Sequence, residues 1–453
     1  MGHEIDRRGF MKSSLLAAAG VAMGPAAARV VAAAAPTAPM AGKRGLDALR
    51  GQTVTCLVSD HPVVTTIQSL IPEFEEKTGI KVILDKVAHR ALPEKVLLTR
   101  GSKDYDVVML QGDDLPNFVD KGLCYPLDDL VASDLRDPEF SLDSLVPCWL
   151  DNCKFQGKLW SLPSSMEIGV LYYRKDLFKK HLGGKTPPKT YAEYLEDAKR
   201  INLKEKDVYA HSWRGVDAQN WQYLIPAWGE RWVDANWTPQ VQTPGHLEIC
   251  NYMLDSAKYC PPGWVAWYYQ EVWMAFQQGN IAMLIDASVA PTMVNPKVSK
   301  LTWQEVGVTA PPRGPKSFAK YNGASGQTFG LAAGVQHKEA AYKWIEFQVL
   351  PRNDKKLVAR GRVPHVLANY KDPELLKDYP ALDGVREAIE AGMRVEGPDR
   401  SFRPRSKALK EMRTVMSRIY STWASGKQAP QAALAELQRE FERITQEAGL
   451  RKG

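Results

Sequence analysis

The sequence predicts an α/β fold with a mainly parallel sheet, and a few neighbouring segments carry this prediction. Residues 53–58 alternate and are rich in β-branched side chains, which is typical of a strand. Residues 64–78 place apolar side chains three and four positions apart and are followed by Gly79, which indicates an amphipathic helix ended by glycine. Residues 80–84 and 105–110 are two further apolar runs. Strand, helix and strand in this order predict parallel strands joined by crossover helices.

Later segments add helices and one more buried strand. Thr190 followed three residues later by Glu193 forms a capping box, which predicts the start of a helix. Residues 265–278 show a helical apolar period, and residues 281–285 form a short apolar run typical of a buried strand. The C-terminal part is mostly helical. Its last helix, after Pro430, aligns on one face Leu434, Leu437, Phe441 and Ile444.

The composition is that of an ordinary globular protein. The chain has 453 residues, of which 44% are hydrophobic and 25% charged. A net charge of +7 is mild for this length, and no block of Lys or Arg forms the basic face that nucleic-acid binding needs. No GxSxG, HExxH, GxGxxG or phosphate-binding loop occurs, and no cysteine–histidine cluster has metal-ligand spacing. We therefore expect no enzyme activity, no cofactor and no metal.

The first residues form a targeting signal. Arg7 and Arg8 are followed by Phe10 and Lys12, and then by an apolar run rich in Ala and Gly. This run is too short to span a bilayer, and no later segment is long and apolar enough to do so. The pattern resembles the twin-arginine signal, so residues 1–35 are expected to direct export to the periplasm. An ordinary secretory signal or a single membrane anchor is the alternative.

The cysteines leave the redox state open. There are six, namely Cys56, Cys124, Cys148, Cys153, Cys250 and Cys260. Cys148 and Cys153 are close enough in sequence to be bridged across a turn, whereas Cys250 and Cys260 flank a helical stretch. An oxidising compartment would permit disulfides. Buried free thiols are the alternative for all six.

Several motifs, in a shared order and spacing, resemble the extracellular solute-binding proteins of the maltose-binding type. The resemblance covers nearly the whole chain after the signal, and each piece alone is weak. The pieces are IPEFEEKTGIKV over residues 71–82, YDVV over 105–108, YYRKDLF over 172–178, PPKTY over 187–191, and the set Phe276, Gly279, Ala282 and Met283.

The resemblance implies two α/β lobes joined by hinge strands, with the ligand in the cleft between them. Each lobe is expected to hold a mainly parallel sheet with flanking helices. By similarity, lobe one takes residues 45–166 and 286–335, and lobe two takes residues 167–285 and 336–453. The family also implies a monomer that binds a sugar or polyol and delivers it to the membrane permease of an ABC importer.

Open α/β sheets bind ligands at the carboxyl ends of their strands, which selects three loops independently of the resemblance. These loops follow residues 58, 110 and 285. Their side chains can accept and donate hydrogen bonds to hydroxyl groups. The candidate contacts in these loops are Asp60, His61, Gln111, Asp113, Asp286 and Ser288.

Two adjacent carboxylates, Asp113 and Asp114, receive different interpretations. In the maltose-binding pattern an acidic residue at the Asp113 position contacts sugar, so we expect Asp113 to bind ligand. The family has Arg where this chain has Asp114. We expect Asp114 to cap the short helix that follows it over residues 115–121.

Five further candidates come mainly from the resemblance. Glu167 stands where the family places a ligand-contacting Glu, and a hinge salt bridge is the alternative. An Arg near Arg214 contacts ligand in related binders, and Trp213, Trp228 and Trp264 could stack on apolar sugar faces. For any single one of these tryptophans, a place in the core is the favoured interpretation.

The expected ligand is small and polar. Where the family often has a stacking Trp, this chain has Asp286 and Ser288 instead. This favours a monosaccharide, a polyol or a sugar acid over a long oligosaccharide. A polyamine is an alternative, and so is a phosphorylated polyol, because Arg214, Arg362, Arg403 and Arg405 could converge on its phosphate. An exported carbohydrate-active enzyme is a further alternative, which the missing motifs disfavour.

Overall fold

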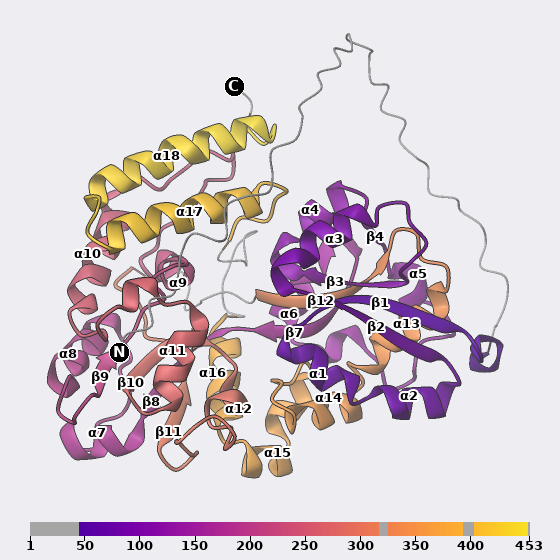
Figure 1. The fold of residues 1–453 in the computed structure, drawn as a ribbon, viewed down its shortest axis with the longest axis horizontal. Coiled ribbons are helices and arrows are strands. Elements are labelled where there is room, and N and C mark those ends of the chain that lie inside the picture. The colour runs from indigo at the N-terminus through magenta and orange to yellow at the C-terminus, as the bar shows by residue number, and fades with distance from the viewer. Residues whose placement is uncertain (1–44, 317–324, 393–402, 452–453) are drawn as a thin grey trace, which may run out of the picture. The chain divides into compact units, whose positions relative to one another are not determined.

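Two sheets organise the part of the chain that the computed structural model describes, which is residues 45–316, 325–392 and 403–451 (Figure 1). The first sheet has the strand order β2-β1-β3-β12-β4, with β7 paired to β12. Its strands are β1 (Thr53–Ser59), β2 (Lys81–Val87), β3 (Val107–Gln111), β4 (Cys124–Tyr125), β7 (Leu162–Glu167) and β12 (Ser325–Ala332). As predicted, β1 runs parallel to β2 and β3, whereas β12 is antiparallel to its three neighbours.

The second sheet has the order β11-β8-β10-β9. Its strands are β8 (Gly169–Arg174), β9 (Tyr209–His211), β10 (Ile281–Ala287) and β11 (Val306–Thr309). β8 is antiparallel to β10 and β11, and β9 is parallel to β10. Among the described strands, antiparallel pairings outnumber parallel ones in both sheets, so the expectation of mainly parallel sheets is corrected to mixed sheets. Antiparallel and parallel strands are both largely buried here, so their apolar runs look alike in sequence.

Helices cover the first sheet and bury a continuous apolar core with it. They are α1 (Pro62–Gln68), α2 (Ile71–Thr78), α3 (Leu92–Leu98), α4 (Leu115–Asp120), α5 (Asp128–Val131), α6 (Pro147–Asn152), α13 (Lys338–Phe347) and α14 (Pro351–Val358). The predicted glycine end of α2 is confirmed, because Gly79 adopts a φ of 68° that most other residues avoid. The two short strands β5 (Lys154–Phe155) and β6 (Lys158–Leu159) pair with each other. We call the first sheet with these helices lobe one.

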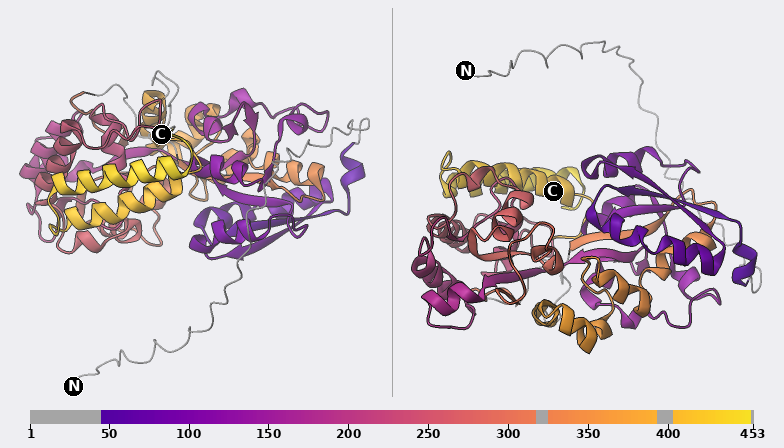
Figure 2. Two further views of the ribbon diagram at one scale, coloured as in Figure 1. Left: turned by 90° about the horizontal axis from the view of Figure 1, so that it is seen from above. Right: turned by 60° about the horizontal axis from the view of Figure 1, so that its bottom comes forward.

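A second set of helices surrounds the second sheet, and together they form lobe two. They are α7 (Lys175–His181), α8 (Tyr191–Ile201), α9 (Gln219–Ala227), α10 (Pro244–Ala257), α11 (Tyr269–Gln277), α17 (Leu409–Ala424) and α18 (Pro430–Glu447). The capping box at Thr190 and Glu193 is confirmed at the start of α8. The last two helices, α17 and α18, lie side by side (Figure 2). The apolar face predicted for the last helix is buried in this core.

A third core joins the lobes where the chain passes from β7 to β8, through Ile168. Helices α12 (Ala290–Met293), α15 (Pro373–Asp378) and α16 (Ala381–Gly392) belong to this region. Three segments, β11, α13 and α14, lie elsewhere than the expected lobe split placed them, and Leu357 of α14 belongs to the core of lobe one. Strand β11 pairs with β8 in lobe two, and α13 packs Ala341 and Trp344 into the core of lobe one. The strand pairing of β11 and the buried apolar face of α13 determine which lobe each belongs to. A resemblance between short sequence segments does not reveal either contact.

All six cysteines are buried free thiols, so no bridge joins Cys148 and Cys153. Within residues 45–316, 325–392 and 403–451, no helix is both long and apolar enough to cross a membrane. The same residues contain no group of three His, Cys, Asp or Glu side chains that could hold a metal ion. The expected signal over residues 1–35 lies outside the described residues.

Candidate functional site

A cavity of about 240 Å³ lies where the ends of three strands meet. Three of the predicted contacts line it: His61 follows β1, Glu167 ends β7, and Ser288 follows β10. Tyr269 and Trp273 of α11 line it as well. Because β1 and β7 belong to lobe one and α11 belongs to lobe two, the cavity has a wall from each lobe. Two of the three loops selected by the strand-end rule, those after β1 and β10, therefore lie at this cavity, whereas the loop after β3 does not.

Glu167 is the unusual group of this cavity. Its side chain is half-buried, and among the described residues no hydrogen bond or ion pair holds the carboxylate. Burial raises the pKa of Glu167 to about 7. The nearby guanidinium of Arg214 opposes this rise, and the carboxylate of Asp286 adds to it. A buried polar group without a partner is costly, and such groups gather at functional sites. The hinge salt bridge considered for Glu167 does not form in this part of the chain.

The lobe-two wall of the cavity is aromatic. Tyr269 and Trp273 are one turn apart on α11, with ring centroids 4.7 Å apart. The Trp273 Nε1 donor is buried and has no partner among the residues described. Neither residue was predicted. Tyr269 and Trp273 are four positions apart, so they share a face of the helix that is not the face burying Val272 and Phe276. This second aromatic face is the sequence signal that could have identified them.

The lobe-one wall contributes His61 in a neutral form. The His61 Nδ1 accepts a hydrogen bond from the backbone N–H of Val63 at 3.3 Å, and its ring lies 5.4 Å from that of His89. Burial, reinforced by the charge of His89, lowers the pKa of His61 to about 4. Asp60 is exposed and accepts a hydrogen bond from the backbone of His89 at 2.8 Å. A neutral imidazole suits contact with an uncharged solute.

Ser288 lies at the hinge end of the cavity. Its Oγ accepts a hydrogen bond from the backbone N–H of Ile168 at 3.0 Å. Because Ile168 lies between β7 and β8, this bond ties the loop after β10 to the crossing between the lobes. Ser288 therefore supports the place where Glu167 sits, as well as lining the cavity.

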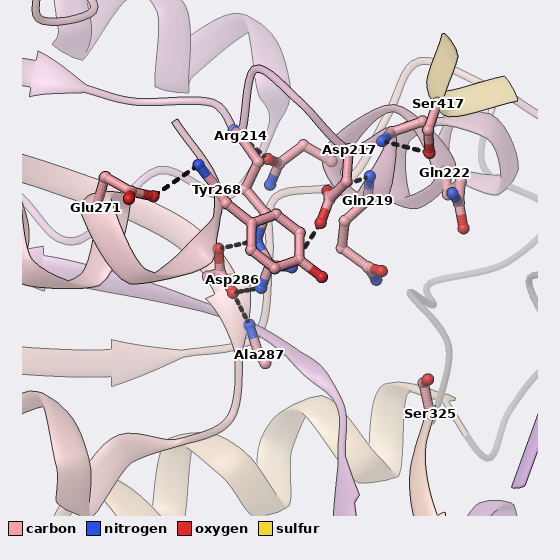
Figure 3. Close-up of polar contacts among 12 residues, drawn as sticks. Arg214, Asp217, Gln219, Gln222, Tyr268, Glu271, Asp286, Ala287, Ser325 and Ser417 are labelled. Carbon is pink, nitrogen blue, oxygen red and sulfur yellow. Dashed lines mark hydrogen bonds and ion pairs between the residues drawn. The ribbon is translucent and has the colours of Figure 1, made fainter. Parts of the chain in front are cut away.

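Arg214 and Asp286 were expected to contact ligand, and the structure instead pairs them with each other (Figure 3). The Arg214 Nε donates to Asp286 Oδ2 at 2.9 Å, and Nη2 makes a second bond to the same carboxylate. Arg214 also bonds Asp217 at 3.3 Å and lies 5.6 Å from the ring centroid of Tyr269. Both residues are buried and neither lines the cavity. Asp286 holds the Arg214 side chain, and Arg214 packs against Tyr269 of the aromatic wall.

Asp113 is fully buried and forms an ion pair with Arg403. Burial raises the pKa of Asp113, but the guanidiniums of Arg403 and Arg413 outweigh it and bring the pKa down to about 2. Asp113 does not line the cavity around Glu167. Its neighbour Gln111 lines a second cavity of about 300 Å³, between lobe one and α17.

The capping role expected for Asp114 is wrong. Asp114 occupies the N-cap position of α4, but its side chain makes no capping hydrogen bond. It instead accepts a hydrogen bond from the Asn117 side chain at 3.3 Å, and it lines the second cavity. Burial and the charge of Asp113 raise the pKa of Asp114 to about 6. The 3₁₀ turn over Gly112–Asp114 leads directly into α4, and the Asp114 carboxylate accepts no hydrogen bond from the first N–H groups of that helix.

The three predicted tryptophans lie in or against the core of lobe two. Trp213 is 1% exposed, and its Nε1 donates to Ser256 Oγ at 2.9 Å. Trp228 packs between Tyr191 and Tyr252. Trp264 is half-buried against the same core. None of the three lines either cavity, so the core interpretation holds for Trp213 and Trp228.

Comparisons with known proteins agree with the two-lobed α/β fold. The family model described as bacterial extracellular solute-binding protein matches residues 59–355. A mannitol-binding protein of Pseudomonas aeruginosa is 24% identical, over 88% of this chain and 95% of its own length. A solute-binding protein of Agrobacterium vitis, solved with bound D-mannitol, has 27% identity and a TM-score of 0.75, covering 88% and 99% of the two chains. One from Agrobacterium radiobacter, solved with ribitol, has 25% identity and a TM-score of 0.77, covering 87% and 99%.

Proposed function

The chain belongs to the family of bacterial extracellular solute-binding proteins, and we propose that it captures a small sugar or polyol in the cavity around Glu167 and delivers it to the permease of an ABC importer. The observation that carries the proposal is the cavity itself. It unites His61, Glu167 and Ser288 with two aromatic side chains, and the Glu167 carboxylate has no partner among the described residues.

The chemistry of the cavity suits hydroxyl groups. An ionised Glu167 can accept two hydroxyl hydrogen bonds. The faces of Tyr269 and Trp273 can pack against the C–H groups of a sugar or polyol. Two structurally similar proteins carry D-mannitol and ribitol, which are small neutral polyols.

The ion pairs of the chain favour a neutral solute over an anion. Three of the four arginines that could have converged on a phosphate or a carboxylate have an aspartate partner, and the fourth, Arg405, donates to backbone carbonyls of Asp151 and Lys154. Arg214 pairs with Asp286, Arg362 pairs with Asp354 at 2.5 Å, and Arg403 pairs with Asp113. At these three arginines a bound anion would have to displace a buried carboxylate, which is unfavourable. A sugar acid or a phosphorylated polyol is therefore the weaker candidate for the solute. Arg360 also lines the cavity and has no ion pair among the described residues, so the screen must include anionic solutes. The relatives compared are binding proteins rather than enzymes, which disfavours the alternative of a carbohydrate-active enzyme.

A thermal-shift screen tests the proposal. D-mannitol, ribitol, monosaccharides, a sugar acid, glycerol 3-phosphate and spermidine are each added to the purified protein. A solute that binds only the folded protein stabilises it by about 2.7 kcal/mol at a hundred times its dissociation constant. We expect a rise in melting temperature with polyols or sugars, and the solute recovered unchanged. A shift with only charged solutes, or chemical conversion of the solute, would contradict the proposal.

Export through the twin-arginine route is part of the same proposal. It rests on the spacing of Arg7 and Arg8 from Phe10 and Lys12. Replacing both arginines with Lys should leave precursor in the cytoplasm, because the pathway requires the pair. Fractionation of cells and detection of the precursor measure this. Normal export of the variant would assign the protein to an ordinary secretory route.

A further inference from the structure

We propose that Arg403 is a positioning residue for the solute site, whose guanidinium bonds both lobes and so fixes the spacing of the two cavity walls. The inference rests on the proposed function for the place of the solute. Arg403 lines neither cavity and is 1% exposed, so it acts through other residues and not by touching the solute.

The contacts of Arg403 divide between the lobes. Its Nε donates to Gln222 Oε1 at 2.6 Å, and its Nη2 donates to Gln219 Oε1 at 2.5 Å; both glutamines belong to α9 of lobe two. Its Nη1 donates to Ser325 Oγ at 3.1 Å and pairs with Asp113, both in lobe one. One planar side chain therefore connects the end of β3 and the start of β12 with the first turns of α9.

On the lobe-one side, the network reaches the cavity in one step. Ser325 is the partner of Glu167 in the pairing of β7 with β12. Opposite residues of an antiparallel pair lie on the same face of the sheet. The bond from Arg403 to Ser325 therefore holds the strand beside the Glu167 carboxylate.

On the lobe-two side, the network reaches the aromatic wall through Asn220. This residue of α9 donates from Nδ2 to the carbonyl of Ile285 at 2.9 Å and accepts a bond from the Arg214 backbone at 2.8 Å. The Arg214 side chain in turn lies against Tyr269. Contiguous chains of hydrogen bonds and packed groups carry coupling between sites in this way.

The chemistry of the position calls for Arg. A guanidinium has only donors, so both Gln219 and Gln222 must turn their Oε1 atoms toward it, which fixes the orientation of both amides. Burial lowers the pKa of Arg403 to about 10, so it stays charged at neutral pH. A lysine could keep the pair with Asp113, but its compact ammonium lacks the rigid fork needed to reach acceptors on both lobes at once.

The test separates positioning from simple charge compensation. The single change Arg403→Met would leave Asp113 buried without its main counterion, so the informative variant is Asp113→Asn with Arg403→Met. A second variant, Gln219→Leu with Gln222→Leu, keeps the ion pair and removes the acceptors on α9. The matched control is Arg418→Gln, because the Arg418 pairs with Glu436 and Glu440 lie within lobe two.

Titration calorimetry with D-mannitol and with ribitol, and small-angle scattering of the solute-free proteins, are the two measurements. We expect both double variants to unfold cooperatively and to lose at least about tenfold in affinity, with Arg403→Lys in between and the control unchanged. We also expect a larger radius of gyration for the solute-free double variants, because the bond between the lobes is gone.

Parental affinity in both double variants would overturn the proposal, since Arg403 would then only neutralise Asp113. A gain in affinity would also overturn it, because Arg403 would then compete with the solute. If the parent protein binds neither polyol, the proposed ligand class fails, and scattering still decides the role of Arg403. An unchanged radius of gyration in solute-free Asp113→Asn/Arg403→Met and Gln219→Leu/Gln222→Leu would refute the bond between the lobes.

Discussion

The fully buried Asp113 and the half-buried Glu167 were both expected to bind the ligand, and they differ in whether a counterion pairs with the carboxylate. Asp113 has a counterion, Arg403, which with Arg413 brings its pKa down to about 2. Glu167 has no bonded partner among the described residues, and burial raises its pKa to about 7. A buried charge that is already paired holds the fold together, whereas a buried carboxylate that lines a cavity without a partner is free to meet a ligand.

The largest expected effect is the loss of stability in Asp113→Ala. Removing one partner of a buried ion pair leaves the other charge uncompensated, which costs about 3–5 kcal/mol. Urea unfolding of the parent and the variant measures this. Asp114→Ala is the matched control. Because burial raises the pKa of Asp114 and its side chain caps no helix, that change should alter stability by less than about 1 kcal/mol. Equal losses in the two variants would mean that Asp113 and Arg403 do not form a pair in solution.

The next effect concerns affinity at Glu167. A hydrogen bond to a charged group is worth about 1.5–3 kcal/mol, so Glu167→Ala should weaken binding of the solute found in the screen by about ten- to a hundredfold. Titration calorimetry measures this. Stability should be unchanged or slightly higher, because a buried carboxylate without a partner is removed. Glu167→Gln keeps the shape and one acceptor and should lose less. Unchanged affinity in Glu167→Ala would exclude this cavity as the solute site.

A smaller effect is expected at the aromatic wall. Trp273→Ala removes a ring face and should reduce affinity by about tenfold while the protein stays folded. Trp213→Ala is the matched comparison in the core of lobe two, where truncation costs about 3–5 kcal/mol of stability. Its affinity should change little under conditions where it is folded. A reversal of the two results would place the solute against Trp213.

The smallest effect is a pH dependence from Glu167. Its pKa in the folded protein lies above the unfolded value, so the folded state retains the proton more strongly. Its contribution to stability is therefore present at low pH and is lost as pH rises through about 7. Solute hydroxyls prefer the ionised form, so affinity should rise about threefold between about pH 6.5 and 7.5. The slope should vanish in Glu167→Gln. An affinity that falls with rising pH would mean that the protonated carboxyl donates to the solute.

Local patterns predicted much of the fold and part of the site. The apolar period predicted one helix over residues 64–78, which the structure divides into α1 and α2, and Gly79 correctly predicted the end of α2. The capping box at Thr190 predicted the start of α8, and strand ends selected the loops that carry His61 and Ser288. Each of these signals lies within a few residues of the element it specifies.

The features that sequence reasoning missed depend on long-range pairing. Asp113 and Arg403 lie 290 positions apart, and the sequence around one gives no sign that the other is its partner. The partner of Arg214, Asp286, is likewise distant in sequence. Arg214 was expected to contact the ligand, and in the structure it pairs with Asp286 and packs against the ring of Tyr269. A charged residue at a strand end has the same local pattern whether a ligand or a distant arginine neutralises it.

A crystal structure of the protein with D-mannitol, or with the solute that gives the largest thermal shift, tests the central claim most directly. The account predicts that the solute lies in the cavity between His61 and Trp273, with its hydroxyls within hydrogen-bond distance of the Glu167 carboxylate, and that the pair of Asp113 with Arg403 is intact. A solute bound instead in the cavity lined by Asp114, or bonded to Asp113 with Arg403 displaced, would contradict it.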